Sequence, residues 1–206
     1  MNPLLAQLDK QVGSLRGCRV VELGAIAGLV SLFHVEEVAS LTVVEPSQDL
    51  IAKVSESLAP EQTRFQIHRS ELSQLAFVGI ESVDVCISSF GAASSSDSER
   101  LFRQVKRILR PSGAFVFSVP HPLIGHRAFQ ELPLDHNYFE TSLVDTRVLQ
   151  LGFEAPGRIS VKPLSKVFAE LKKVGLYVDT FEEVSLEGGR IRSKMPDFAV
   201  LKCKKL

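Results

Sequence analysis

Tryptophan is absent from the 206 residues, tyrosine occurs twice, and 24 basic residues balance 24 acidic ones to a formal net charge of zero. The three cysteines, Cys18, Cys86 and Cys203, are far apart and form no CxxC pair, which argues against a disulfide framework or a zinc knuckle. Zero net charge provides no general attraction for nucleic acid or an anionic membrane. The sequence also lacks a phosphate loop of the form GxxxxGK[ST], a metal-spaced histidine pair and a Ser/His/Asp order, so several common kinds of site are excluded.

Long apolar runs are missing too. No stretch approaches the roughly 18 apolar residues that a membrane-spanning helix needs, and the beginning of the sequence lacks the basic-then-apolar layout of a signal peptide. The 45% apolar and 23% charged fractions are those of a globular protein. We therefore expect a cytoplasmic protein that forms one domain over residues 1–206.

Short apolar runs alternate with helical patterns along most of the chain. The runs predict strands near 18–24, 41–46, 63–68, 82–88 and 114–119. Helical spacing predicts helices over 3–15, after a turn within 25–38, from the Ser47 N-cap to 58, over 98–109 and over 163–176. The segment Arg110–Gly113 is expected to end the fourth of these helices in a turn. This alternation indicates a mainly parallel sheet with helices on both faces.

Two later segments break the alternation. Residues 176–185 and 196–203 flank a Gly188–Gly189 turn and alternate apolar with polar residues, which is typical of an antiparallel hairpin. Residues 121–162 are rich in proline and glycine without clean periodicity. Since long connections of this kind are often lids or binding segments, we expect an insertion over the carboxyl edge of the sheet.

A candidate ligand site follows the first predicted strand. The turn from Gly24 to Gly28 leads into a helical pattern, and such a turn lets a polar ligand approach backbone N–H groups. Glu45 ends the next strand, 21 positions after Gly24, where a carboxylate can accept hydrogen bonds from ribose hydroxyls. Taken separately, the glycines could merely close a turn and Glu45 could be a solvated acid. Together they indicate a nucleotide-type ligand.

These residues resemble the motifs of class I S-adenosylmethionine-dependent methyltransferases, in particular the type 11 branch. The matching segments are VVELGAIAGLVSL, VVEP, VDVCISSFG, LRPSGAFVFSVPHPL and PLSKVFAELKKVGL, which together extend over nearly the entire chain. The resemblance implies an α/β fold with a doubly wound, Rossmann-like, seven-stranded sheet, mainly parallel with an antiparallel last strand. It also implies S-adenosylmethionine as the cofactor, lying across the carboxyl ends of the first two strands.

The resemblance further implies which residues contact the cofactor. They are Glu22, Gly24 and Gly28 at its methionine part, Glu45 on the ribose, Pro46 beside the adenine, Ser70 or Glu71 near the adenine amino group, and Ser88 and Ser89 on the approach to the sulfonium. Phe90, His121 and Tyr138 would face the substrate, with His121 as the best available base and no metal required. For His121 and Tyr138, purely structural roles remain as alternatives.

The predicted function is therefore methyl transfer from S-adenosylmethionine to an acceptor. A small-molecule acceptor is favoured over nucleic acid because the net charge is zero and no basic, aromatic stripe is present. A homodimer or a partner protein stays open. Ile26 stands where the family has a glycine, which keeps a second hypothesis open, an inactive methyltransferase-like scaffold. A nicotinamide-dependent oxidoreductase would need a conventional GxGxxG.

Overall fold

Outside residues 121–162, where two strands were not predicted, the described helices and strands follow one another in the order that the apolar runs predict. The computed structural model describes residues 3–24, 34–58, 65–90, 97–123, 138–145, 158–185 and 195–205. The helices are α1 (Pro3–Val12), α3 (Gln48–Leu58), α4 (Ser98–Ile108) and α6 (Leu164–Val174). The strands are β1 (Arg19–Leu23), β2 (Ser40–Val44), β3 (Phe65–His68), β4 (Val83–Ser88), β5 (Leu109–Pro120), β6 (Ser142–Asp145), β7 (Arg158–Val161), β8 (Leu176–Val184) and β9 (Phe198–Lys205).

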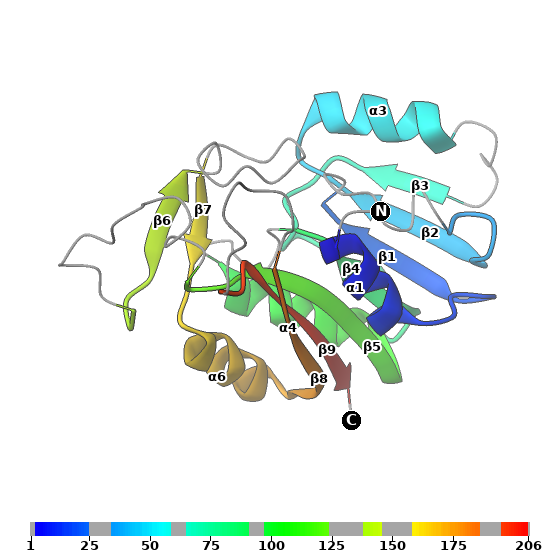
Figure 1. Ribbon diagram of the computed structural model, residues 1–206. Coiled ribbons are helices and arrows are strands. Elements are labelled where there is room, and N and C mark those ends of the chain that lie inside the picture. Colours follow the sequence, from blue (N-terminus) through cyan, green and yellow to red (C-terminus); the bar gives the residue numbers. More distant parts are fainter. Residues whose placement is uncertain are drawn as a thin grey trace.

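Seven of these strands form one sheet in the order β3-β2-β1-β4-β5-β9-β8. Neighbouring strands from β3 to β5 pair in parallel, whereas β9 runs antiparallel to both β5 and β8. The predicted doubly wound, Rossmann-like sheet is confirmed, including the single reversed strand at the end of the chain. In this topology β1 lies between β2 and β4 inside the sheet, so the carboxyl ends of these three parallel strands are neighbours at one sheet edge (Figure 1).

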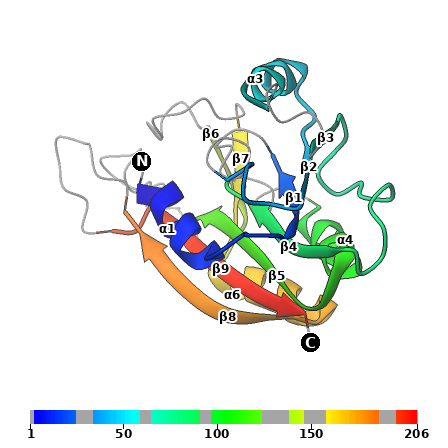
Figure 2. The same ribbon diagram turned by 90° about the vertical axis from the view of Figure 1, so that its right-hand side faces the viewer.

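Apolar side chains cover both faces of the sheet. Leu4 and Leu8 of α1 and Val54 of α3 pack with one set of strand residues. Phe102 of α4 and Leu171 of α6 pack with the opposite set. Figures 1 and 2 show α1 on one side of the strands and the packed pair α4 and α6 on the other. The molecule is therefore a three-layer arrangement, as a parallel sheet requires.

The start of β5 differs from the sequence prediction. Leu109, expected on the apolar face of a helix, opens the strand instead and pairs with Val83, and the register then shifts before Ala114. The expected turn at Arg110–Gly113 is an irregularity within this strand, and the positive φ of 63° falls on Ser112 rather than on the glycine. Gly113 is required for space, because a Cβ there would lie 2.9 Å from the Arg110 carbonyl oxygen.

The helix ends agree more closely with their predicted signals. The Ser47 Oγ accepts the Leu50 N–H at 3.4 Å at the start of α3. Gly175 ends α6 with a φ of 78°, and its N–H bonds back to the last turn of the helix. Residues 25–33, where a further helix is expected, lie outside the described ranges.

Residues 121–162 contain the paired strands β6 and β7, which form a separate antiparallel ladder from Ser142↔Val161 to Asp145↔Arg158. The ladder stands beside the main sheet and leads directly into α6 (Figure 1). Ile159 and Val161 join the same core cluster as α1. No helix in the described ranges is long and apolar enough to span a membrane.

Candidate functional site

Polar residues gather at the carboxyl edge of the sheet, where β2, β1 and β4 lie side by side. Gly24 follows β1, Glu45 follows β2, and Ser88 ends β4. Because parallel strands end at the same edge, the fold brings together groups that are far apart in the sequence. This edge, at a point where strand order reverses direction, is where open α/β sheets bind their ligands.

The Gly24 turn is built around a conformation that glycine favours. Its φ is 82°, and its N–H donates to the Val44 carbonyl at 2.9 Å, which holds the turn against the end of β2. A Cβ added at Gly24 would lie 3.7 Å from the Phe90 carbonyl oxygen, so the turn also borders the end of β4. A side chain here would strain the backbone even though it would fit in the available space.

Glu45 is 3% exposed and held in place by local hydrogen bonds. Its N–H donates to the His68 carbonyl at 3.1 Å, and its Oε1 accepts the Ser47 N–H at 2.8 Å. The carboxylate is thus fixed at the strand end, as a ribose contact would require. Pro46 is exposed beside it.

Ser88 and Ser89 bring two buried hydroxyls to the same edge. Both side chains are fully buried, and both Oγ atoms lack a hydrogen-bond partner among the described residues. A buried hydroxyl without a partner carries a desolvation cost of about 1–3 kcal/mol, so such groups usually have a ligand or a water to bond. Their placement beside the Gly24 turn fits a polar cofactor. Ser118 was not among the expected site residues, although a serine within the apolar run AFVFSVP was a signal, and its hydroxyl donates to the Ser89 carbonyl at 2.8 Å.

The other expected cofactor contacts lie around these groups. Glu22 is fully buried in β1, paired in register with Val43 and Ile87. After β3, the Ser70 hydroxyl donates to the Gln74 carbonyl at 3.2 Å, and Glu71 is exposed. Gly28, and with it Ile26, lies outside the described residues.

Two of the expected substrate residues pack against other aromatic rings. Phe90 is buried, and its ring meets Phe198 edge to face at 5.7 Å. Tyr138 is half-buried and packs edge to face with the exposed Phe139 at 5.4 Å. Neither contact by itself indicates a bound substrate.

His121 follows β5 and is 4% exposed, with both ring nitrogens engaged. Nδ1 accepts the Leu123 N–H at 3.1 Å, and Nε2 lies 2.9 Å from the Glu183 Oε1. Burial lowers the pKa of His121 below its usual value, although Glu183 opposes this shift. The ring is therefore a neutral imidazole that donates through Nε2 and accepts through Nδ1, and this arrangement leaves no lone pair for a proton from a substrate.

A cavity of about 280 Å³ lies elsewhere, lined by the first and middle residues of β1 and β2, the start of β4, part of β3 and the connection before β4. Arg19, Ser40, Gln66 and Phe77 are among its lining residues. It is therefore distinct from the candidate site. Within the described ranges no cluster of side chains could hold a metal ion.

Comparison with known proteins shows what the chain resembles. Residues 21–117 match the family model of the methyltransferase domain, whereas no curated protein matches the sequence. This segment is similar to a methyltransferase domain, as the sequence motifs predicted, and the chain has the fold of methyltransferases of known structure. Those methyltransferases are S-adenosylmethionine-dependent.

Three solved structures illustrate the likeness. An S-adenosylmethionine-dependent methyltransferase from Mesorhizobium loti is 22% identical, with a TM-score of 0.76 and coverage of 97% of this chain and 96% of that one. The 1,6-didemethyltoxoflavin-N1-methyltransferase of Burkholderia thailandensis, solved with 1,6-didemethyltoxoflavin and S-adenosylhomocysteine, is 16% identical, with a TM-score of 0.65 and coverage of 98% and 76%. The [4+2]-cyclase SpnF is 14% identical, with a TM-score of 0.69 and coverage of 98% and 79%. At these identities the likeness shows the fold.

Proposed function

We propose that this protein binds S-adenosylmethionine at the carboxyl ends of β1, β2 and β4 and transfers its methyl group to a small-molecule acceptor. The observation that carries the proposal is the pair of buried, unpartnered hydroxyls of Ser88 and Ser89 beside the left-handed Gly24 turn. A cofactor with several polar groups would provide the hydrogen bonds that these hydroxyls lack.

Each residue at the edge then has a role. Glu45 accepts hydrogen bonds from the ribose, and its fixed orientation reduces the entropy lost on binding. Gly24 and Glu22 lie at the methionine part with Gly28, while Pro46, Ser70 and Glu71 border the adenine. Ser88 and Ser89 lie on the approach to the sulfonium. The bound cofactor supplies an electrophilic methyl group, so the protein's main task is alignment of the acceptor.

Binding of the acceptor is assigned to Phe90 and to residues 121–162, which include Tyr138. We take these residues as an insertion in a single domain. His121 stands at the root of this segment, and its hydrogen bond to the Leu123 N–H favours a positioning role over that of a base. A base, where the acceptor needs one, would come from another group.

A small-molecule acceptor is supported by the balanced charge and by the toxoflavin-type substrate of one structural neighbour. A cytoplasmic location is supported by Cys18, Cys86 and Cys203, which are all free thiols. SpnF, a cyclase of the same fold, shows that the fold alone does not determine the reaction. The proposal therefore rests on the edge residues.

Calorimetric titration with S-adenosylmethionine tests the proposal. We expect the parent to bind and Glu45→Ala to bind about tenfold or more weakly, because a charged hydrogen bond contributes about 1.5–3 kcal/mol. Glu56→Ala, an exposed carboxylate on α3, is the matched control and should bind like the parent. No binding by the parent at millimolar concentration would overturn the proposal and favour the scaffold hypothesis. Parental affinity in Glu45→Ala would remove only the ribose assignment.

A further inference from the structure

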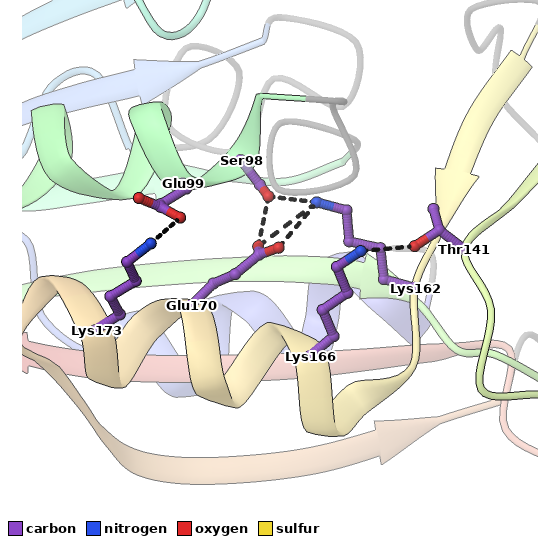
Figure 3. A network of polar contacts seen from close by, with 7 residues as sticks. All are labelled: Ser98, Glu99, Thr141, Lys162, Lys166, Glu170 and Lys173. Carbon is purple, nitrogen blue, oxygen red and sulfur yellow. Dashed lines mark hydrogen bonds and ion pairs between the residues drawn. The ribbon is translucent and has the colours of Figure 1, made fainter.

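A buried ion pair joins three separate segments near the candidate site. Lys162, directly after β7, is 8% exposed, and its Nζ lies 3.4 Å from the Glu170 Oε1 of α6. Ser98, the first residue of α4, stands between them: Lys162 donates to its Oγ, and that hydroxyl donates to the Glu170 Oε2. Figure 3 shows the three side chains pointing toward one another from a strand end and two helices.

The network lies beside elements assigned to both functions. Helix α4 packs on the cofactor side: the Phe102 ring lies 5.6 Å from that of Phe117 of β5, and Phe117 pairs in register with Ser88, which the proposed function assigns to the cofactor. Residues 121–162 are assigned to the acceptor, and Lys162 is their last residue. The bond between Lys162 and Ser98 therefore joins the last residue of the acceptor segment to the helix that packs beside the cofactor side.

Stability alone does not account for such a pair. Removing two charges from water is costly, and replacing a buried ion pair by apolar side chains of similar size is often neutral or stabilising. Apolar side chains would not fix α4, α6 and β7 in one relative position through directed hydrogen bonds. The neighbouring hydrogen bond from Lys166 to Thr141 differs from this buried pair (Figure 3). It lies at the exposed surface, so its formation requires little desolvation of the charged group.

On the basis of the proposed function, we propose that Lys162 is a positioning residue. Through Ser98 and Glu170 it holds α4, and hence Phe117 and its paired residue Ser88, in the geometry that binds S-adenosylmethionine. Lys162 itself is buried against its partners Ser98 and Glu170. Its effect is carried by the helix that it holds.

The test separates positioning from stability by removing one charge or both. Lys162→Met and Glu170→Met each leave an unpaired buried charge, so each should lower the melting temperature by about 10 °C. The double variant Lys162→Met/Glu170→Met leaves no such charge, and its melting temperature should return to within a few degrees of the parent. Calorimetric titration of the double variant should nevertheless show S-adenosylmethionine binding about threefold or more weaker. Lys166→Met is the control for a lysine of the same region and should match the parent in both measurements.

Parental affinity in a double variant with a parental melting temperature would overturn the inference, since the network would then be only structural. No binding by the parent would instead overturn the proposed function and this inference with it. If the double variant fails to fold, Ser98→Ala decides the question. It keeps the ion pair and removes only the link to α4, so weaker binding at an unchanged melting temperature supports positioning, and unchanged binding contradicts it.

Discussion

At the scale of single residues, the carboxyl edge of the sheet is buried and polar at once. Glu22, Glu45, Ser88 and Ser89 are all at most 3% exposed, although polar groups are expensive to bury. A fold under selection for stability alone would place apolar residues there, as it does in the middle of the strands. The cost is consistent with a site whose polar groups are completed by a ligand.

His121 gives this edge a pH dependence whose sign follows from the burial of its ring. Burial holds its pKa below the unfolded value, against the opposing charges of Glu183 on β8 and Asp197 before β9. The unfolded chain therefore binds more protons between the two pKa values, and stability should fall as pH decreases below about 6.5. Denaturant unfolding from pH 8 to pH 5, compared between the parent and His121→Gln, measures this dependence.

The comparison cancels contributions from the other four histidines. We expect a steeper loss of stability in the parent, because protonation at Nδ1 also removes the acceptor of the Leu123 N–H. Identical pH profiles would show that the His121 ring titrates as it does in the unfolded chain.

Gly24 carries a second prediction at this scale. Gly24→Ala should destabilise the protein by about 1–2 kcal/mol, since an L-residue at a φ of 82° is strained. Gly79→Ala is the control, because its φ is outside that region and its nearest contact for a Cβ is 3.4 Å. Urea unfolding should place the control within about 1 kcal/mol of the parent. Equal effects of the two substitutions would contradict the role of the turn conformation.

Sequence reasoning found part of this edge and missed part. The spacing of Gly24 and Glu45 is a local pattern, so the order of residues alone was enough to place both at strand ends. The partners of His121 could not be predicted, because Glu183 and Asp197 come from the distant β8–β9 region and reach the ring only through the sheet order. The link from Lys162 to Ser98 was missed for the same reason.

At the scale of elements, the connection from β3 to β4 differs from the helical connection that parallel strands usually have. The described residues between His68 and Val83 form turns rather than a covering helix. Arg107 of α4 reaches into this connection, where it donates to the Val78 carbonyl at 3.0 Å and the Leu75 carbonyl at 2.6 Å. One side chain from a neighbouring helix thus bonds carbonyls that a helix would satisfy internally.

Arg107→Met should therefore destabilise the protein by about 2 kcal/mol, because hydrogen bonds from a charged donor contribute about 1.5–3 kcal/mol each and these are partly solvated. Arg103→Met is the control, since Arg103 is on the same helix and forms an exposed pair with Glu99. Its stability should stay within about 0.5 kcal/mol of the parent in the same denaturant titration. Similar effects of both substitutions would show that the connection does not depend on Arg107.

The boundary between α4 and β5 shows why element ends were harder to predict than elements. Apolar periodicity continues through Leu109, so the sequence pattern extends the helix by one residue. In the structure Leu109 pairs with Val83, and this long-range pairing with β4 outweighs the local pattern. The interiors of α4 and β5 were predictable because their burial is periodic.

At the scale of the whole molecule, the two edges of the sheet differ in kind. Near the amino ends, Asp84 of β4 pairs with Arg19 of β1 and Arg110 of β5. Burial opposes ionisation of Asp84, but the hydrogen bonds from Arg19 and the charge of Arg110 outweigh it and hold the pKa of the carboxyl below its usual value. The amino ends of β1, β4 and β5 thus carry ion pairs whose charges are satisfied, while the carboxyl edge has hydroxyls that lack partners among the described residues.

A sheet that runs unbroken through both halves of the chain predicts cooperative behaviour. Helices α1 and α3 pack on one face of the seven strands, and α4 and α6 pack on the other. Because both cores share the same sheet, unfolding of one core would expose apolar residues of the other. We expect one calorimetric unfolding transition.

A ligand that binds only the folded state, present at a concentration of 100 times its dissociation constant, adds about 2.7 kcal/mol to the free energy of unfolding. For a chain of this length, that raises the melting temperature by roughly 5–10 °C. Scanning calorimetry with and without saturating S-adenosylmethionine measures both effects. Two separate transitions, of which only one shifts with S-adenosylmethionine, would contradict the single-domain view and locate the site in one part of the chain.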